Sequence, residues 1–212
     1  ERFVNVFSHS MLTPTDKFWN IGMPRNDILK NPDPEKSKAI KNKIGLSEND
    51  KLVLFAPTYR KIDDNYFNDS VAISYGIDEE ATINALSERF GGKWIFAYRY
   101  HPCIVNRQKF EQTGSIIDLT DYDDMQELLL AADVLINDFS SSMWDFMLTE
   151  KPCFIFAKDM DRYIETTDLY TPVSEWPFPI AESNEELVNN ILNFELLSSA
   201  SKPQEEHADE DK

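Results

Sequence analysis

Three short groups of polar residues, each directly after an apolar run, contain the side chains of this sequence that could do chemistry. The groups are Thr58-Tyr59-Arg60, Arg99-Tyr100-His101 and Asn137-Asp138-Phe139-Ser140-Ser141-Ser142. An arginine can clamp two anionic oxygens at once, and an imidazole can donate to a phosphate oxygen or act as an acid for a leaving phosphate. Hydroxyls and free backbone amides at a helix start also attract anions. These residue types indicate a site for phosphate or diphosphate.

Each group also has a plain structural explanation when it is taken alone. The serines after Phe139 can simply cap a helix, and His101, which Pro102 holds in an extended conformation, can be an ordinary loop residue. Their shared placement after apolar runs favours a common site. The usual ATP and dinucleotide fingerprints, a glycine-rich P-loop or GxGxxG, are absent from the sequence.

Other candidate positions have weaker support. In the turn Gly22–Asp27, Asn26 or Asp27 can cap the residues that follow. The segment Asp159-Met160-Asp161 superficially resembles the DxD metal motif of one class of glycosyltransferases, but it follows an apolar run as a helix start, so we expect no metal there. His9 and His207 have no motif around them.

The two cysteines, Cys103 and Cys153, are fifty residues apart and lie in or beside apolar runs. That spacing fits neither a disulfide framework nor a zinc knuckle, so it indicates a reducing compartment. We expect both to be buried small hydrophobic residues.

Elements that could position these groups follow from the hydrophobic pattern. The runs 51–56, 94–98, 115–119, 133–137 and 152–156 are apolar on both faces, as strands between two helical layers are. Helical periods cover 79–90, 124–132, 140–150 and 184–197, and a lysine-rich helix over 35–43 ends at Gly45. The alternation predicts an α/β fold with an open, mostly parallel, Rossmann-like sheet and helices on both faces.

The strand order decides whether the three polar groups meet. In open α/β sheets the ligand crevice lies outside the carboxyl ends of the strands, where the order reverses. If the order is 3-2-1-4-5, the strands that precede all three groups are neighbours. The polar groups would then form one site.

Composition limits the class of protein. With 212 residues and 42% hydrophobic content the chain can build a sizeable core, which excludes wholesale disorder. A formal charge of −17 argues against a surface that coats nucleic acid or anionic lipid. No stretch has the roughly 18 apolar residues of a spanning helix and no leader pattern opens the sequence, so we expect a chain that is neither secreted nor membrane-spanning.

Three segments lack periodicity. Residues 1–20 carry scattered aromatic residues. The segment 61–76 is polar and long for a connection, so we expect it to be a mobile surface loop near the site. Residues 198–212 are mostly charged, without aromatic or branched apolar residues, and we expect a disordered acidic tail.

Four motifs in order carry a family resemblance: Gly22-Met-Pro-Arg-Asn-Asp27, Ala56-Pro-Thr-Tyr-Arg60, Arg99-Tyr-His-Pro102, and Asn137-Asp-Phe-Ser-Ser-Ser142 with Trp144-Asp145-Phe146. Over about residues 15–195 the chain resembles the CDP-glycerol glycerophosphotransferases, the teichoic acid primases and polymerases. The resemblance implies the C-terminal, donor-binding half of a two-domain GT-B enzyme. Residues 1–20 would then be an inter-domain segment and 21–197 the nucleotide-donor-binding domain.

The resemblance also implies a reaction. A CDP-activated polyol, most familiarly CDP-glycerol and less often CDP-ribitol, would transfer its polyol phosphate to a hydroxyl of a cell-wall or capsule polymer and release CMP. His101 would stabilise or protonate the leaving phosphate as the candidate catalytic residue, without metal or cofactor. The pyrophosphate would be held by Thr58, Arg60, His101, Ser140 and Ser141, with general donor-site roles for Arg25, Arg99 and Asp145.

The sequence departs from the family at one motif. The usual family form there is Thr-Asp-Tyr-Ser-Ser, whereas this chain has Asn137 and Phe139 in place of the threonine and tyrosine. The loss of two hydroxyls leaves the polyol of the donor open. The family's acceptor domain, with its general base, lies outside these residues, so we expect the chain alone to bind donor but to transfer poorly.

The resemblance implies partners and a location too. The partners are the CDP-activated donor and a polymer acceptor, with no nucleic acid, and membrane contact would come only through the rest of the enzyme or the acceptor lipid. The expected location is the cytoplasmic face of a bacterial membrane.

Two other functions stay open on the residues alone. A GT-B glycosyltransferase or an epimerase that uses a UDP-sugar would place similar polar groups at the same strand ends. In a non-catalytic nucleotide-binding or interaction module, Arg60 and His101 would be mere surface residues.

Overall fold

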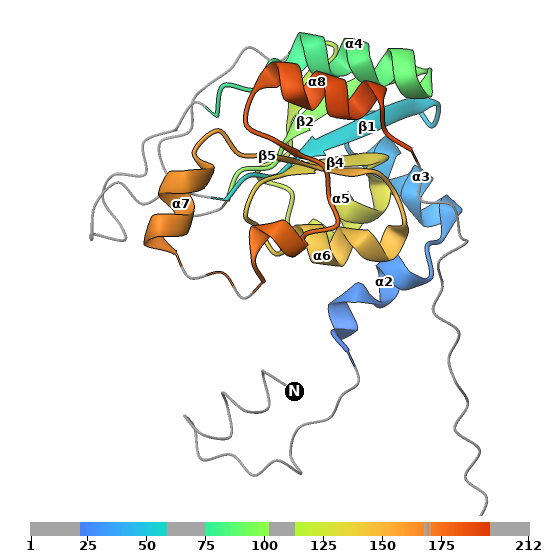
Figure 1. The fold of residues 1–212 in the computed structure, drawn as a ribbon. Coiled ribbons are helices and arrows are strands. Elements are labelled where there is room, and N and C mark those ends of the chain that lie inside the picture. Colours follow the sequence, from blue (N-terminus) through green and yellow to red (C-terminus); the bar gives the residue numbers. More distant parts are fainter. Residues whose placement is uncertain (1–21, 59–74, 102–112, 168, 170, 196–212) are drawn as a thin grey trace, which may run out of the picture.

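A six-stranded sheet forms the centre of the computed structural model, which describes residues 22–58, 75–101, 113–167, 169 and 171–195. The strand order is β3-β2-β1-β4-β5-β6, and every pairing is parallel (Figure 1). The strands are β1 (Asp50–Phe55), β2 (Lys93–Tyr98), β3 (Ile116–Asp118), β4 (Val134–Asn137), β5 (Cys153–Phe156) and β6 (Ile180–Ala181). The predicted fold class and the order of the first five strands are confirmed.

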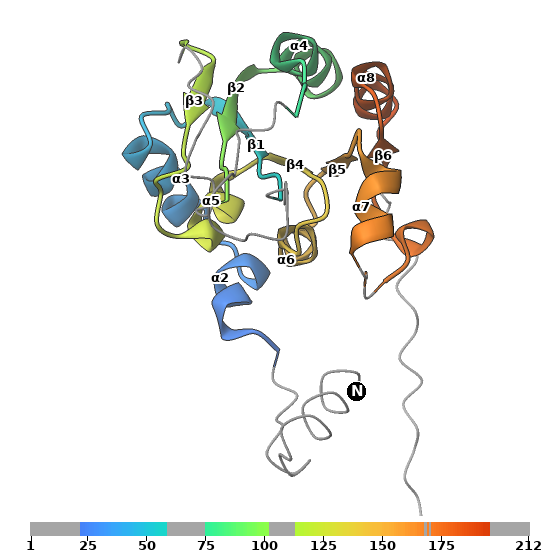
Figure 2. The same ribbon diagram turned by 90° about the vertical axis from the view of Figure 1, so that its left-hand side faces the viewer.

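Helices cover both faces of this sheet. Figures 1 and 2 show α4 and α8 on one face and α3, α5 and α6 on the other. The helices are α2 (Asp27–Lys30), α3 (Pro34–Lys43), α4 (Glu79–Phe90), α5 (Met125–Ala131), α6 (Ser142–Phe146), α7 (Met160–Thr166) and α8 (Asn184–Leu192), with the 3-10 turns η2 (Pro24–Asn26), η3 (Met147–Thr149) and η4 (Val173–Glu175).

Strand β1 shows why the runs are apolar throughout. Leu52 and Leu54 pack into the core beneath α3, α5 and α6, whereas Val53 and Phe55 pack into the core beneath α4 and α8. Successive side chains of a strand point to opposite faces, so a strand covered on both sides needs apolar residues at every position.

Helix starts and ends follow local chemistry. Asp78 and Asp124 accept hydrogen bonds from backbone amides in the first turns of α4 and α5, at 2.9 and 3.1 Å. Gly45, at φ 82°, follows α3 in the left-handed region that glycine adopts without strain. The predicted bounds of these three helices are confirmed to within one residue.

Three details differ from the prediction. Strand β6, of two residues, was not predicted because so short a run has no detectable period. The predicted helix over 140–150 begins later, at Ser142, and its last turn tightens into η3. Helix α8 ends at Leu192 rather than at 197.

Several predictions fall on residues outside the described part of the chain. These are the segment 1–20, the loop over 61–74, the tail 198–212, and Arg60, Cys103, His9 and His207. Cys153 is buried in β5, as predicted, and burial raises the pKa of its thiol.

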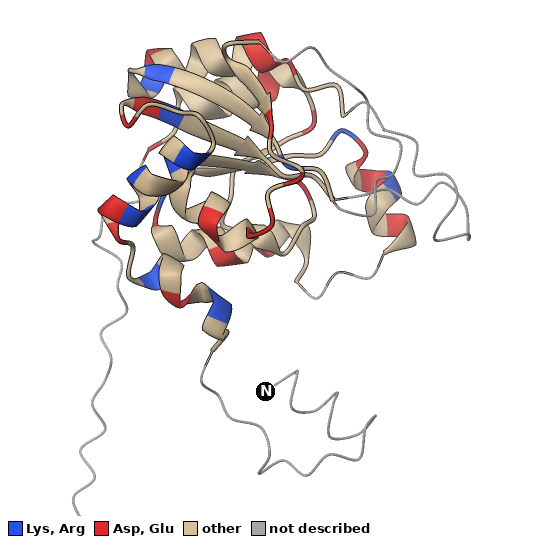
Figure 3. Cartoon of the chain, turned by 180° about the vertical axis from the view of Figure 1, so that it is seen from behind, with Lys and Arg blue, Asp and Glu red and all other residues tan. Residues whose placement is uncertain are grey.

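Basic side chains are unevenly distributed over the described elements. Figure 3 shows Lys and Arg on α2 and α3 and near the amino ends of strands, and acidic residues on α4.

Among the residues that the structure describes, no helix combines the length and the apolar character needed to cross a membrane.

Candidate functional site

Asp138 joins the carboxyl ends of β1 and β4. Its carboxylate is fully buried, and Oδ1 accepts hydrogen bonds from the backbone N–H groups of Thr58 at 2.8 Å and Phe139 at 2.6 Å. A buried carboxylate is stable when backbone donors replace its hydration. The polar groups after β1 and β4 therefore meet, as the predicted strand order requires.

The end of β2 lies on the other side of β1. The N–H of Arg99 donates to the carbonyl of Phe55 at 2.9 Å, which continues the parallel ladder one residue past the end of β2. The guanidinium of Arg99 donates from Nη1 to the carbonyl of Tyr100 at 2.8 Å. The arginine thus folds back along the short segment that carries His101.

His101 is exposed at this edge of the sheet. Its pKa lies below the ordinary value of 6.5, mainly because partial burial disfavours the charged ring and also because the positive charge of Arg99 is near. A bound anion would offset the charge of Arg99 and favour the imidazolium. The pair is therefore suited to an anionic ligand that His101 can protonate.

The serines after β4 have different surroundings. Asn137 is fully buried and donates from Nδ2 to the carbonyl of Ser140 at 2.8 Å and to Oγ of Ser142 at 3.3 Å. Oγ of Ser140 lies 3.1 Å from Oγ of Ser142 and accepts from its N–H at 3.4 Å. Ser141 is exposed and its side chain makes no capping hydrogen bond. Of the three hydroxyls, that of Ser141 is the one turned to solvent.

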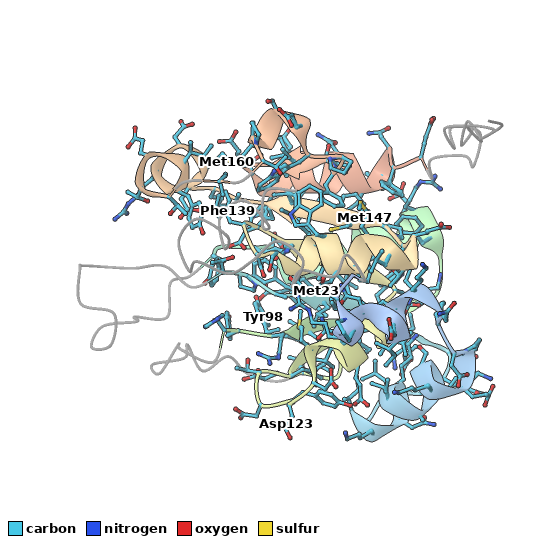
Figure 4. The ribbon with its side chains drawn as sticks, turned by 90° about the horizontal axis from the view of Figure 1, so that it is seen from below. Met23, Tyr98, Asp123, Phe139, Met147 and Met160 are labelled. Carbon is cyan, nitrogen blue, oxygen red and sulfur yellow. The ribbon has the colours of Figure 1, made fainter. Side chains whose placement is uncertain are left out.

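Phe139 joins this turn through its backbone N–H, whereas its ring packs against aromatic residues. Its ring stacks on that of Tyr163 in α7, with centroids 3.7 Å apart and planes 2° apart, and it contacts Trp176 edge-on. Phe139 and Met160, the first residue of α7, belong to the same hydrophobic core (Figure 4). The phenylalanine found where the family usually has tyrosine therefore lies against an aromatic neighbour, where a ring needs no hydroxyl.

Arg25 and Asp145 form a second assembly. Asp145 is 9% exposed, and its Oδ2 lies 3.1 Å from Nη2 and 3.2 Å from Nε of Arg25. Nδ2 of Asn26 donates to Oδ1 at 2.6 Å, and Nε2 of Gln126 donates to Oδ2 at 3.1 Å. The carboxylate thus joins η2 and α2 to α5 and α6. Asn26 is at the N-cap position of α2 but makes no capping bond.

The predicted site residues thus fall into two assemblies. The strand-end group holds Thr58, Arg99, His101, Ser140 and Ser141, whereas Arg25 and Asp145 contact each other together with Asn26 and Gln126. Gln126 was not singled out in the sequence because a single glutamine in a helix forms no motif. Tyr75, whose hydroxyl donates to the carbonyl of Thr58, was also missed. It is an aromatic residue at the end of a polar segment.

The Asp159–Asp161 segment is a helix start, as predicted, with Asp159 at the N-cap position of α7. In the part of the chain that the structure describes, no group of three or more His, Cys, Asp or Glu side chains is arranged to hold a metal ion.

Comparisons with known proteins give one family and several relatives. The family described as CDP-glycerol:poly(glycerophosphate) glycerophosphotransferase matches residues 3–208. A teichoic acid glycerol-phosphate transferase of Staphylococcus aureus is 31% identical over 195 residues, which are 90% of this chain and 49% of that protein. A teichoic acid poly(glycerol phosphate) polymerase of Bacillus subtilis is 29% identical over 176 residues, which are 80% of this chain and 23% of the polymerase.

Solved structures of the wall teichoic acid polymerase TagF have the same fold. A TagF variant soaked with CDPG superposes with a TM-score of 0.71 at 29% identity, covering 90% of this chain and 46% of that one. The chain therefore spans about half the length of the Staphylococcus aureus transferase and of the TagF structure.

Proposed function

Because the chain belongs to the CDP-glycerol:poly(glycerophosphate) glycerophosphotransferase family, we propose that it is the donor-binding half of an enzyme that transfers a polyol phosphate from a CDP-activated donor. The acceptor is a hydroxyl of a teichoic-acid-like polymer. The observation that carries the proposal is the meeting of Thr58, the Arg99–His101 segment and the Ser140–Ser142 turn at one edge of the sheet. Cationic, imidazole and hydroxyl groups together suit a diphosphate.

The proposed reaction is a displacement at the β-phosphorus of the donor. An acceptor hydroxyl forms the new P–O bond, the bond to the bridging oxygen breaks, and CMP leaves with that oxygen. The proton of the acceptor goes to a base outside this chain. His101 donates to the leaving phosphate, while Arg99, the exposed Ser141 hydroxyl and Arg60 balance the charge that spreads over the phosphoryl oxygens.

Glycerol is the proposed polyol. The glycerol-phosphate transferase of Staphylococcus aureus is 31% identical to this chain, whereas a poly(ribitol-phosphate) polymerase of Bacillus spizizenii is 28% identical. The TagF structure soaked with CDPG supports the same choice. The difference in identity is small, so donor binding decides between the two polyols.

The division of the chain is part of the proposal. Residues 21–197 form the donor-binding domain, 1–20 lead to it from another domain, and 198–212 are an acidic tail. The half-length coverage of TagF supports the view that a second domain supplies the acceptor site and the base.

The cysteine pattern and the bacterial relatives support the cytoplasmic face of a bacterial membrane as the place of reaction.

Calorimetric titration tests this function. The chain should bind CDP-glycerol more tightly than CDP-ribitol and much more tightly than a UDP-sugar. His101→Ala should weaken binding about tenfold, as expected for loss of a hydrogen bond to a charged group. Lys36→Ala, on the exposed side of α3, is the matched control and should bind like the unsubstituted chain.

Other results would point to other functions. Preference for a UDP-sugar would favour a GT-B glycosyltransferase or an epimerase. Absence of binding by every nucleotide diphosphate would favour an interaction module. Rapid CMP release by the isolated chain with a polymer acceptor would contradict the proposed need for a second domain.

A further inference from the structure

Tyr75 connects two of the polar groups at the edge of the sheet. It is the first described residue after the segment 59–74, and its hydroxyl donates to the backbone carbonyl of Thr58 at 2.8 Å. The two residues on either side of this long segment are therefore bonded to each other. The segment between them includes Arg60.

The bond acts on a peptide that is also held from the other side. The N–H of Thr58 donates to the buried carboxylate of Asp138, and its carbonyl accepts from Tyr75. With partners on both of its backbone polar groups, Thr58 has little freedom to rotate. Asp138 and Tyr75 together therefore restrain the backbone from which the Thr58 side chain projects.

The ring of Tyr75 reaches the neighbouring strand. It packs edge-on against Phe55 of β1, with centroids 5.6 Å apart, and stacks on Tyr100 at 6.1 Å with planes 23° apart. Tyr100 is buried, directly precedes His101, and donates from its N–H to Oγ1 of Thr120 at 3.1 Å. Tyr75 thus contacts the backbone of Thr58 and the residue that carries His101.

We propose that Tyr75 is a positioning residue that fixes the spacing between Thr58 and His101 for a bound diphosphate. The proposal rests on the proposed function, because it assumes that these two residues bind the donor. Tyr75 acts through Thr58 and Tyr100 and needs no contact with the ligand itself. Aromatic rings suit this task because they add large contact area with few rotatable bonds.

Tyr98 offers a matched control within the same aromatic stack. Its ring stacks on Tyr100 from the β2 side with centroids 5.2 Å apart, and its hydroxyl donates to Glu79 of α4. Tyr98→Phe and Tyr75→Phe each remove one hydroxyl from a ring that stays in place. Of the two, only Tyr75→Phe removes the hydrogen bond to the Thr58 carbonyl.

The test compares CDP-glycerol binding by calorimetry in these variants. Tyr75→Phe should weaken binding about three- to tenfold, the range expected for one lost hydrogen bond. Tyr98→Phe should stay within about twofold of the unsubstituted chain. Because Tyr75 acts through Thr58, its loss should add little to that of Thr58→Ala in the double variant.

A second readout needs no ligand. In NMR spectra of the free chain, Tyr75→Phe should shift the Thr58 amide and the His101 ring resonances, whereas Tyr98→Phe should leave both close to their original positions. Equal binding by the unsubstituted chain and Tyr75→Phe, or additive losses with Thr58→Ala, would overturn this inference alone. If the unsubstituted chain binds no CDP-glycerol, the proposed function itself is wrong.

Discussion

At the scale of single residues, two side chains decide the chemistry of the strand-end group. Asp138 uses one carboxylate oxygen to hold two backbone amides from different strand ends. His101 lies beside Arg99, and its ring prefers the neutral form in the free chain. Asp138 sets the geometry of the group, and in the reaction that we propose His101 supplies a proton once a bound anion has raised its pKa.

His101 should titrate below 6.5 in NMR spectra of the free chain, because burial and Arg99 both disfavour its charged form. Its contribution to stability is present above the unfolded-state pKa and is lost as the pH falls through the lower folded value. Arg99→Gln should raise this pKa, and so should addition of CDP. The resonance is assigned by its loss in His101→Gln; an unchanged pKa with CDP would contradict contact between imidazole and diphosphate.

Asp138→Ala should lower the free energy of unfolding by about 2–4 kcal/mol, because the amides of Thr58 and Phe139 lose their shared acceptor. Asp138→Asn keeps an oxygen at the same place and should cost less. Urea unfolding measures both. Equal stability of Asp138→Ala and the unsubstituted chain would mean that water replaces the carboxylate without loss.

At the scale of elements, one carboxylate joins three short segments. Asp145 of α6 accepts from Arg25 and Asn26 at the start of α2 and from Gln126 of α5. Helix α2 has four residues, too few to be stable by itself. Contacts to α5 and α6 therefore hold it in place.

Asp145→Ala should cost about 1–3 kcal/mol, since three donors lose one acceptor. Arg25→Gln should cost less than about 1 kcal/mol, because the arginine side chain is 52% exposed and such pairs contribute little. Urea unfolding gives both values. Hydrogen exchange should show faster opening of residues 24–30 in Asp145→Ala than in the unsubstituted chain, and uniform opening over the whole fold would contradict a local role.

At the scale of the whole molecule, the sheet separates two hydrophobic cores. One lies beneath α2, α3, α5 and α6, and the other beneath α4 and α8. Leu128 is fully buried in the first and Leu86 in the second. Among the described residues, no buried side chain belongs to both cores, and the strands lie between them.

Leu86→Ala and Leu128→Ala should each lower the free energy of unfolding by about 2–4 kcal/mol, the usual cost of a cavity at a buried leucine. Because the sites lie on opposite faces, the double variant should lose the sum to within about 0.5 kcal/mol. Urea unfolding at matched temperature measures this. A loss far from the sum would show that the sheet transmits strain between the cores.

The sequence alone determined most of the helices and strands, and the order of the polar groups along them. Strands buried on both faces need apolar residues at every position, and amphipathic helices repeat their apolar residues with the helical period. Both patterns are local and can be detected without knowledge of the fold. Strand β6 had no such pattern, since two residues are too few to show a repeat.

Only the tertiary structure decided which of these residues meet. Thr58 and Asp138 are 80 positions apart and Arg25 and Asp145 are 120 apart, and strand order and helix packing bring each pair together. Tyr75 likewise reaches the carbonyl of Thr58 because the chain returns to the end of β1. No local period encodes such contacts, because they depend on how the whole sheet is assembled.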